Sequence, residues 1–101
     1  MDLALEPDFS LGGITVAPSA REVRIGGDRE LLEPRVMQVL VRLNRSANQV
    51  VSRDALFASC WGGLTVGEDA INRVMARLRR LSEQSEAAGF KLETIRGVGY
   101  R

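Results

Sequence analysis

The chain has 101 residues, 45% of them hydrophobic and 27% charged, so we predict one folded domain spanning residues 1–101. Its 14 Lys and Arg residues nearly balance 13 Asp and Glu residues, and the formal net charge of +1 excludes a globally basic nucleic-acid binder. The absence of histidine and the presence of one cysteine, Cys60, exclude a disulfide framework, a Cys/His metal site and the usual nucleophile–base pairs. We therefore expect no enzyme activity, no metal and no cofactor.

The first third of the chain predicts a small antiparallel sheet after a disordered lead-in at residues 1–8. Phe9–Val16 mixes apolar and β-favouring residues around Gly12-Gly13, a pair that indicates a turn or bulge. Residues 22–25 alternate polar and apolar side chains, and a second glycine pair at 26–27 turns the chain into residues 29–32. These two segments form a predicted hairpin whose register the sequence leaves open.

Three helices are expected next. Pro34 suits the first helical position because its missing N–H has no helical partner there, and an apolar stripe continues to about residues 44–48. Residues 49–51 favour a short β-like link, and Ser52 is the predicted N-cap of a second helix that Gly62-Gly63 ends. Thr65 and Glu68 have the capping-box spacing that opens a third helix, which runs to about residue 85.

The chain closes with a predicted hairpin made of Lys91–Ile95 and Tyr100–Arg101. Its turn contains Gly97 and Gly99, which we expect to supply positive φ angles. Only two residues follow this turn, which suggests an excised domain or a native chain that continues.

The third predicted helix is amphipathic and carries a dense group of arginines. At ~100° per residue, one arc of ~120° holds Ile71, Val74, Met75, Leu78 and Leu81. Arg73 and Arg80 lie on the opposite face, and Arg77 lies on its flank. Taken alone, such arginines are typical of a solvated helix face.

The order of strands, three helices and a glycine hairpin is that of a helix-turn-helix followed by a wing, and five local sequences strengthen the match. They are LEPRVMQVL (32–40), VVSRDAL (50–56), CWG (60–62), NRVMARLRR (72–80) and ETIRGVGYR (93–101). In this order they resemble the OmpR/PhoB-type winged-helix domain. The resemblance implies an α+β fold, in which a four-stranded N-terminal antiparallel sheet supports three helices and a C-terminal β-hairpin wing.

The resemblance also implies sequence-specific binding of double-stranded DNA for transcriptional regulation, with the third helix in the major groove and the wing in the minor groove. The implied DNA-contacting positions are Trp61, Asp69, Ala70, Arg73, Ala76, Arg77, Arg80, Thr94, Arg96 and Tyr100. Arg79 matches a structural position whose guanidinium pairs with an acid inside the domain. In the family, the loop that contains Gly63, Leu64 and Thr65 can touch RNA polymerase.

Some residues depart from the family pattern. Asp69 stands where many members carry a basic or neutral contact residue, and the short Ala70 and Ala76 leave fewer helix side chains to read bases. An alternative function is therefore a winged-helix protein-interaction module without specific DNA binding. The chain shows no long heptad helix, so we expect a monomer in solution that pairs in tandem on adjacent half-sites.

The start of the chain suggests a particular parent protein. Few residues precede the first predicted strand, which resembles the CadC/ToxR-like arrangement, in which the winged helix comes first and a membrane segment or sensor follows. No apolar run approaches the ~18 residues of a membrane span, and the acidic start is no signal peptide. We expect a cytoplasmic domain, tethered to the inner membrane where such a parent chain anchors it.

Overall fold

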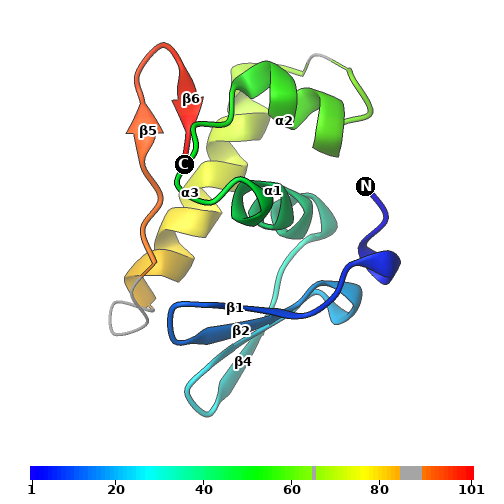
Figure 1. Ribbon diagram of the computed structural model, residues 1–101, viewed down its shortest axis with the longest axis vertical. Helices are drawn as coiled ribbons and strands as arrows, with labels where there is room; N and C mark the ends of the chain where they lie inside the picture. The colour runs from blue at the N-terminus through cyan, green and yellow to red at the C-terminus, as the bar shows by residue number, and fades with distance from the viewer. Residues whose placement is uncertain (65, 85–89) are drawn as a thin grey trace.

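A four-stranded antiparallel sheet forms the lower layer in Figure 1, a computed structural model that describes residues 1–64, 66–84 and 90–101. Its strands lie in chain order as β1 (Phe9–Leu11), β2 (Ile14–Ala17), β3 (Glu22–Ile25) and β4 (Asp28–Leu31). The predicted turn in the first segment is confirmed at Gly12, whose φ of 60° costs glycine little. The predicted hairpin is also confirmed, with Ile25 opposite Asp28 and Val23 fully buried.

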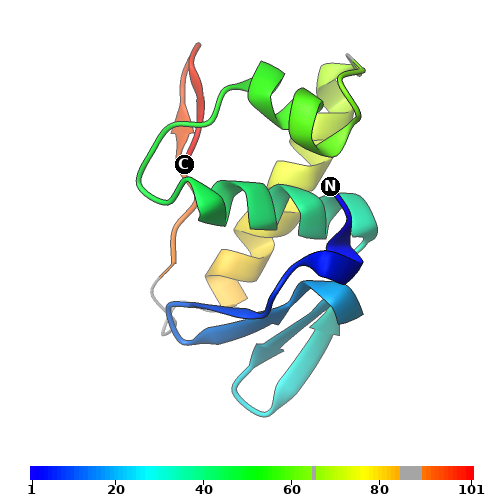
Figure 2. The same cartoon turned by 45° about the vertical axis from the view of Figure 1, so that its right-hand side comes forward.

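Three helices lie on one side of the sheet: α1 (Pro34–Arg45), α2 (Arg53–Cys60) and α3 (Glu68–Gln84). Helix α1 lies between the sheet and α2, and α3 crosses α1 and extends toward the sheet, as Figures 1 and 2 show. Pro34 begins α1 as predicted, and the predicted cap of α2 is confirmed because the Ser52 hydroxyl accepts a hydrogen bond from the Ala55 N–H at 3.1 Å. Thr65, the predicted cap of α3, lies outside the described residues.

The first eight residues are ordered against the helices, unlike the predicted disordered lead-in. Leu3–Leu5 form a short 3-10 helix, η1, and Met1 and Leu3 pack against the core. The Gln38 side chain of α1 donates a hydrogen bond to the Met1 carbonyl at 3.1 Å. Because these contacts join segments that are distant in the sequence, no local pattern indicates them. A second 3-10 helix, η2 (Pro18–Ala20), connects β2 to β3.

The wing is a hairpin of β5 (Thr94–Ile95) and β6 (Gly99–Tyr100), shorter than the strand predicted from residue 91. It is attached to the link between α1 and α2, because Val51 and Tyr100 exchange two backbone hydrogen bonds of 2.7 and 2.9 Å. Gly97 has the predicted positive φ, at 74°, but Gly99 does not. A Cβ on Gly99 would instead collide with the carbonyl group of Val51, so this glycine is needed for close approach rather than for the turn.

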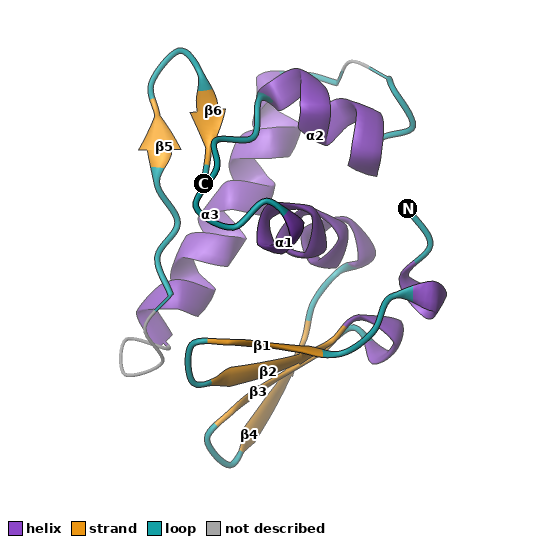
Figure 3. Ribbon diagram, in the orientation of Figure 1, coloured by secondary structure: helices purple, strands orange, loops and turns teal. Residues whose placement is uncertain are grey.

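These elements make an α+β winged helix-turn-helix, which confirms the predicted fold class (Figure 3). The core lies where α1 meets the sheet, α2 and α3, and its largest fully buried side chains include Ile14, Leu32, Met37, Leu56, Ile71 and Leu81. Within the described residues, no helix combines the length and the apolar character needed to cross a bilayer.

Candidate nucleic-acid interface

Helix α3 buries one face and exposes the other. The predicted apolar stripe is confirmed, since Ile71, Val74, Met75, Leu78 and Leu81 are all buried. Asp69, Asn72, Arg73, Ala76 and Arg80 are exposed on the other side. Asp69 and Glu68 lie in the first turn, where an acidic side chain stabilises the positive end of the helix dipole. Asp69 therefore has a structural reason to be acidic.

Three exposed arginines lie on α3 and the wing. Arg73 and Arg80 lie on α3, and Arg96 lies in the turn between β5 and β6. Across residues 1–64, 66–84 and 90–101, none of the three forms an ion pair or a side-chain hydrogen bond. Next to Arg96, Val98 is an apolar side chain left 59% exposed near the tip of the wing. This surface can attract an anion without first breaking a contact of its own.

Arg77 lies differently from the outward position predicted for it. Its guanidinium pairs with the Glu30 carboxylate of β4, with Nη2 2.9 Å from Oε2. Both side chains are partly buried, at 26% and 29% exposure. Ala70, two helical turns away on the same flank, is also only half-buried. These two predicted contact positions therefore face the sheet side of α3 more than its exposed face.

Arg79 joins α3 to the wing. The expected acidic partner is not the one observed, because the Arg79 guanidinium donates a hydrogen bond to the Thr94 hydroxyl of β5. Both residues are exposed, and β5 is the strand that passes beside this flank of the helix (Figure 1). Thr94, predicted to contact DNA, thus already holds the wing against α3.

Two polar residues that the sequence analysis did not single out lie on the same side. Asn72 is exposed one helical turn before Ala76, so helical periodicity would have been sufficient to place it on the exposed face. Arg53, the first residue of α2, pairs with Glu68 of α3. Hydrogen bonding with Tyr100 and, to a smaller extent, with Glu68 raises the pKa of Arg53 above its usual value, so Arg53 stays a cation. The N-terminus of α2 is in this way tied to the start of α3.

Trp61 and Tyr100 are mainly core residues, with 9% and 3% exposure. The Trp61 ring packs edge-to-face on Phe57 at 5.6 Å between centroids, and the Arg35 guanidinium lies 5.1 Å from the Trp61 ring centroid. Little of either predicted residue faces solvent, because Trp61 packs on Phe57 at the C-terminal end of α2 and Tyr100 pairs with Val51 in the link before α2. Their contact with phosphate stays a prediction for the exposed edge of each ring.

The loop between α2 and α3 carries an exposed apolar side chain. Leu64 is 70% exposed, and the two preceding glycines have positive φ angles of 63° and 82°. Gly63 and Leu64 thus belong to an irregular surface loop, while Thr65 lies outside the described residues.

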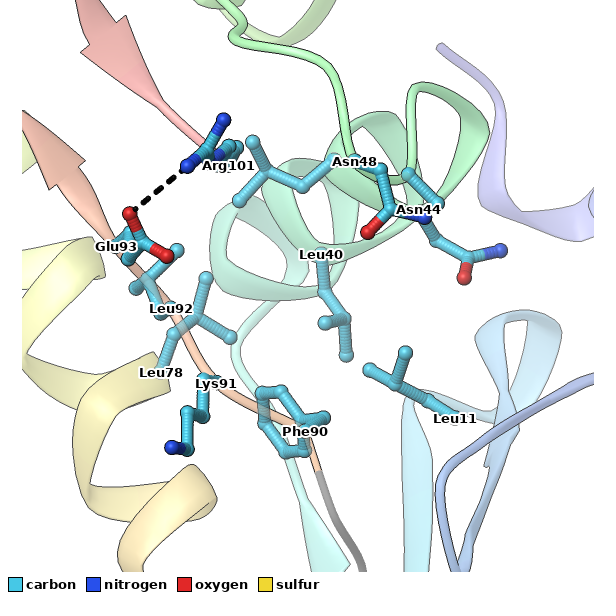
Figure 4. Close-up of a pocket in the computed structure, with 12 residues that line it drawn as sticks. Leu11, Leu40, Asn44, Asn48, Leu78, Phe90, Lys91, Leu92, Glu93 and Arg101 are labelled. Atoms are coloured by element: carbon cyan, nitrogen blue, oxygen red, sulfur yellow. Dashed lines mark hydrogen bonds and ion pairs between the residues drawn. The ribbon is translucent and has the colours of Figure 1, made fainter.

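A separate pocket of about 370 Å³ lies at the C-terminal end of α1, and its lining includes none of Arg73, Arg80 and Arg96. Figure 4 shows Leu40, Leu78, Phe90 and Leu92 around it. The Arg101–Glu93 ion pair, at 3.3 Å, lies at one end. Because more than half of its lining residues are apolar, this pocket is less suited to binding a polyanion than the surface that carries Arg73, Arg80 and Arg96.

Comparisons with known proteins agree with this arrangement. Residues 27–101 match the family described as "Transcriptional regulatory protein, C terminal". The transcriptional regulatory protein YvrH of Bacillus subtilis is 31% identical over 90 residues, which cover 86% of this chain and 37% of that protein.

Two solved structures share the fold. The DNA-binding domain of Escherichia coli CadC has a TM-score of 0.82 at 27% identity, covering 95% of this chain and 91% of that one. The DNA-binding domain of Klebsiella pneumoniae RstA, solved in complex with the RstA box, has a TM-score of 0.74 at 27% identity, covering 94% and 95%. The chain spans less than half the length of the curated relatives that it matches first.

Proposed function

Because the chain belongs to the family of C-terminal domains of transcriptional regulatory proteins, of the OmpR/PhoB winged-helix type, we propose that it binds double-stranded DNA sequence-specifically. In the proposed complex, α3 enters the major groove and the wing reaches the adjacent minor groove, and binding serves transcriptional regulation. The observation that carries this proposal is a set of three arginines, Arg73, Arg80 and Arg96, that have no partner among the described residues. They lie on two elements, α3 and the wing, that the Arg79–Thr94 hydrogen bond holds together.

Arg73 and Arg96 have different roles in this proposal. Arg73 lies on the exposed face of α3, where a guanidinium can bind guanine O6 and N7 with two hydrogen bonds. The neighbouring Asn72 supplies an amide of the kind that pairs with adenine. Arg96, at the turn of the wing, favours the narrow minor groove of A·T-rich DNA, where the negative potential is strongest.

The remaining predicted positions support these two arginines. Three of these positions add no positive charge to the helix, so they affect its fit to DNA rather than its electrostatic attraction. They are Asp69, Ala70 and Ala76. Arg80, Thr94, Trp61 and Tyr100 are proposed phosphate contacts at the edges of the interface. With about three to five phosphate contacts, the log–log salt slope of binding should be about −3 to −4.5.

The test compares Arg73→Ala and Arg96→Ala on duplexes derived from a site selected with the purified domain. Arg73→Ala should cost about 1–3 kcal/mol on the selected site and relax the preference at one base pair. Arg96→Ala should weaken binding most on sites flanked by A-tracts and leave the central preference intact. The control is Arg29→Ala on β4, which removes the same charge from a side chain 69% exposed on the sheet.

Two outcomes contradict the proposal. If no duplex binds at low salt, the domain is better explained as a protein-interaction module. If both arginine variants lose the same affinity on every site, neither arginine reads sequence.

The proposal extends to assembly and to a protein partner. The apolar stripes of the helices are buried in one core, so we infer a monomer that pairs only on half-sites spaced near one turn of DNA. Light scattering that finds a stable dimer without DNA contradicts this. The exposed Leu64, with Gly63 and Thr65, is a proposed contact with RNA polymerase, and Leu64→Ser should lower activated transcription without changing DNA affinity.

A further inference from the structure

Arg77, a predicted DNA contact, already pairs with an acidic side chain of this domain. Its partner Glu30 lies 47 positions earlier, on the outer strand β4. The two side chains are each about a quarter exposed, so water and salt screen this pair less than they would screen a fully exposed pair. The contact therefore persists in the free domain and keeps the Arg77 guanidinium at the edge of β4.

Four arginines and one acidic residue, Glu33, line the groove beside this pair. A groove of about 420 Å³ lies between β4, the start of α1 and α3, and its lining includes Arg35, Arg73, Arg77 and Arg80. Arg73 and Arg80 are unpaired across the part of the chain that the structure describes, whereas Arg77 is not. Glu30 thus neutralises the charge of one of the four arginines that lie next to the exposed face of α3.

Arg77 is also within reach of that face. Its direction on the helix lies ~80° from the centre of the exposed face, a rotation that a long flexible arginine side chain can span. An arginine released from its carboxylate is then available to a phosphate of bound DNA. Each phosphate that a protein neutralises steepens the salt dependence of binding by about 0.9 on the log–log scale.

We propose that Glu30 is a positioning residue that withholds Arg77 from DNA and so sets the strength of binding. This inference rests on the proposed DNA-binding function. DNA must compete with the Glu30 carboxylate for Arg77, which lowers affinity to a similar extent on every sequence because a released Arg77 binds phosphate rather than a base edge. Glu30 thereby limits sequence-independent binding without touching DNA.

The experiment compares Glu30→Gln with the control Glu33→Gln. Both substitutions raise the net charge by one, and Glu33 lines the same groove but forms no ion pair within the described residues. The affinity of a short labelled duplex of mixed sequence is measured over a series of salt concentrations, for both variants in the wild-type and the Arg77→Ala backgrounds. Retained folding is checked for each variant by thermal unfolding.

Glu30→Gln should tighten binding about two- to fivefold more than Glu33→Gln does, the range expected for losing one partly exposed ion pair. Its salt slope should steepen by about 1 relative to Glu33→Gln, and both differences should vanish when Arg77 is replaced by alanine. Equal tightening by the two variants overturns the role of Glu30. Weaker binding by Glu30→Gln also overturns it, since Glu30 would then orient Arg77 toward DNA. If even the wild type binds no duplex, the proposed function itself fails.

Discussion

Substituting Gly99 by alanine tests how the wing is attached to the helices. A Cβ at this position would collide with the Val51 carbonyl oxygen and would lie 2.8 Å from the Val51 carbonyl carbon and 2.9 Å from the Ser52 Cα. All three atoms belong to the backbone, so no side-chain rotation relieves the collision. Gly99 has no left-handed φ, so the expected effect comes from lack of space alone.

The expected loss of stability follows from the contacts that break when β6 moves away from the link between α1 and α2. If β6 moves away from the link, the two Val51–Tyr100 backbone hydrogen bonds are lost. At a net value of about 0.5–1.5 kcal/mol each, the free energy of unfolding should fall by about 1–3 kcal/mol. For a domain of this size that lowers Tm by about 4 °C or more. The wing should also lose its fixed position relative to α3.

Urea unfolding followed by the fluorescence of Trp61 measures this change, because the ring is buried in the folded domain. The matched control is Gly27→Ala: a Cβ on Gly27 meets no atom within 4 Å, and its φ is not positive. Gly27→Ala should be neutral or stabilising by up to about 1 kcal/mol, because alanine restricts the unfolded chain. An unfolding midpoint for Gly99→Ala that matches the control would refute the close-approach argument.

Three further predictions concern stability. Burial raises the pKa of the Cys60 thiol to about 11, so iodoacetamide at pH 8 should alkylate it only as fast as the domain unfolds. The stability that comes from burying the neutral thiol is present below pH ~9, and it should be lost as the pH rises toward 11. Ser52→Ala should lower the free energy of unfolding by about 1 kcal/mol, because the Ala55 N–H loses its side-chain acceptor, whereas Ser52→Asp should retain most of the stability. Deleting residues 1–8 should lower the unfolding midpoint, because the bond from Gln38 and the packing of this segment are lost; an unchanged midpoint would support a disordered lead-in.

The helices and hairpins were predictable because their signals are local. Pro34 fixes the start of α1 through its own backbone geometry, and Ser52 caps α2 through a hydrogen bond to a residue only three positions away. The buried stripe of α3 follows from helical periodicity, which depends on nothing outside the helix. Each of these signals is complete within one element.

The errors arose where a residue's neighbour comes from a distant part of the chain. A helical wheel gives the direction of Arg77 but cannot show that β4 brings Glu30 to meet it. The same holds for Arg79, whose partner is the Thr94 hydroxyl rather than an acid. For Gly99, the predicted turn gives one reason for a glycine. Only the tertiary structure shows that the Val51 backbone leaves no room for a Cβ at this position.

Net charge is a poor guide to this surface for the same reason. Of the arginines on α2, α3 and the wing, those at 53, 77 and 79 each bind a side chain of this domain, and those at 73, 80 and 96 bind none within the described residues. A chain with a formal charge of +1 can thus place three arginines that are unpaired within the described residues on one helix and one hairpin. Counterion release depends on the cations that reach phosphate, so the salt slope should follow the unpaired arginines rather than the total charge. Replacing Glu30 changes that number by one, whereas replacing Glu33 changes only the total.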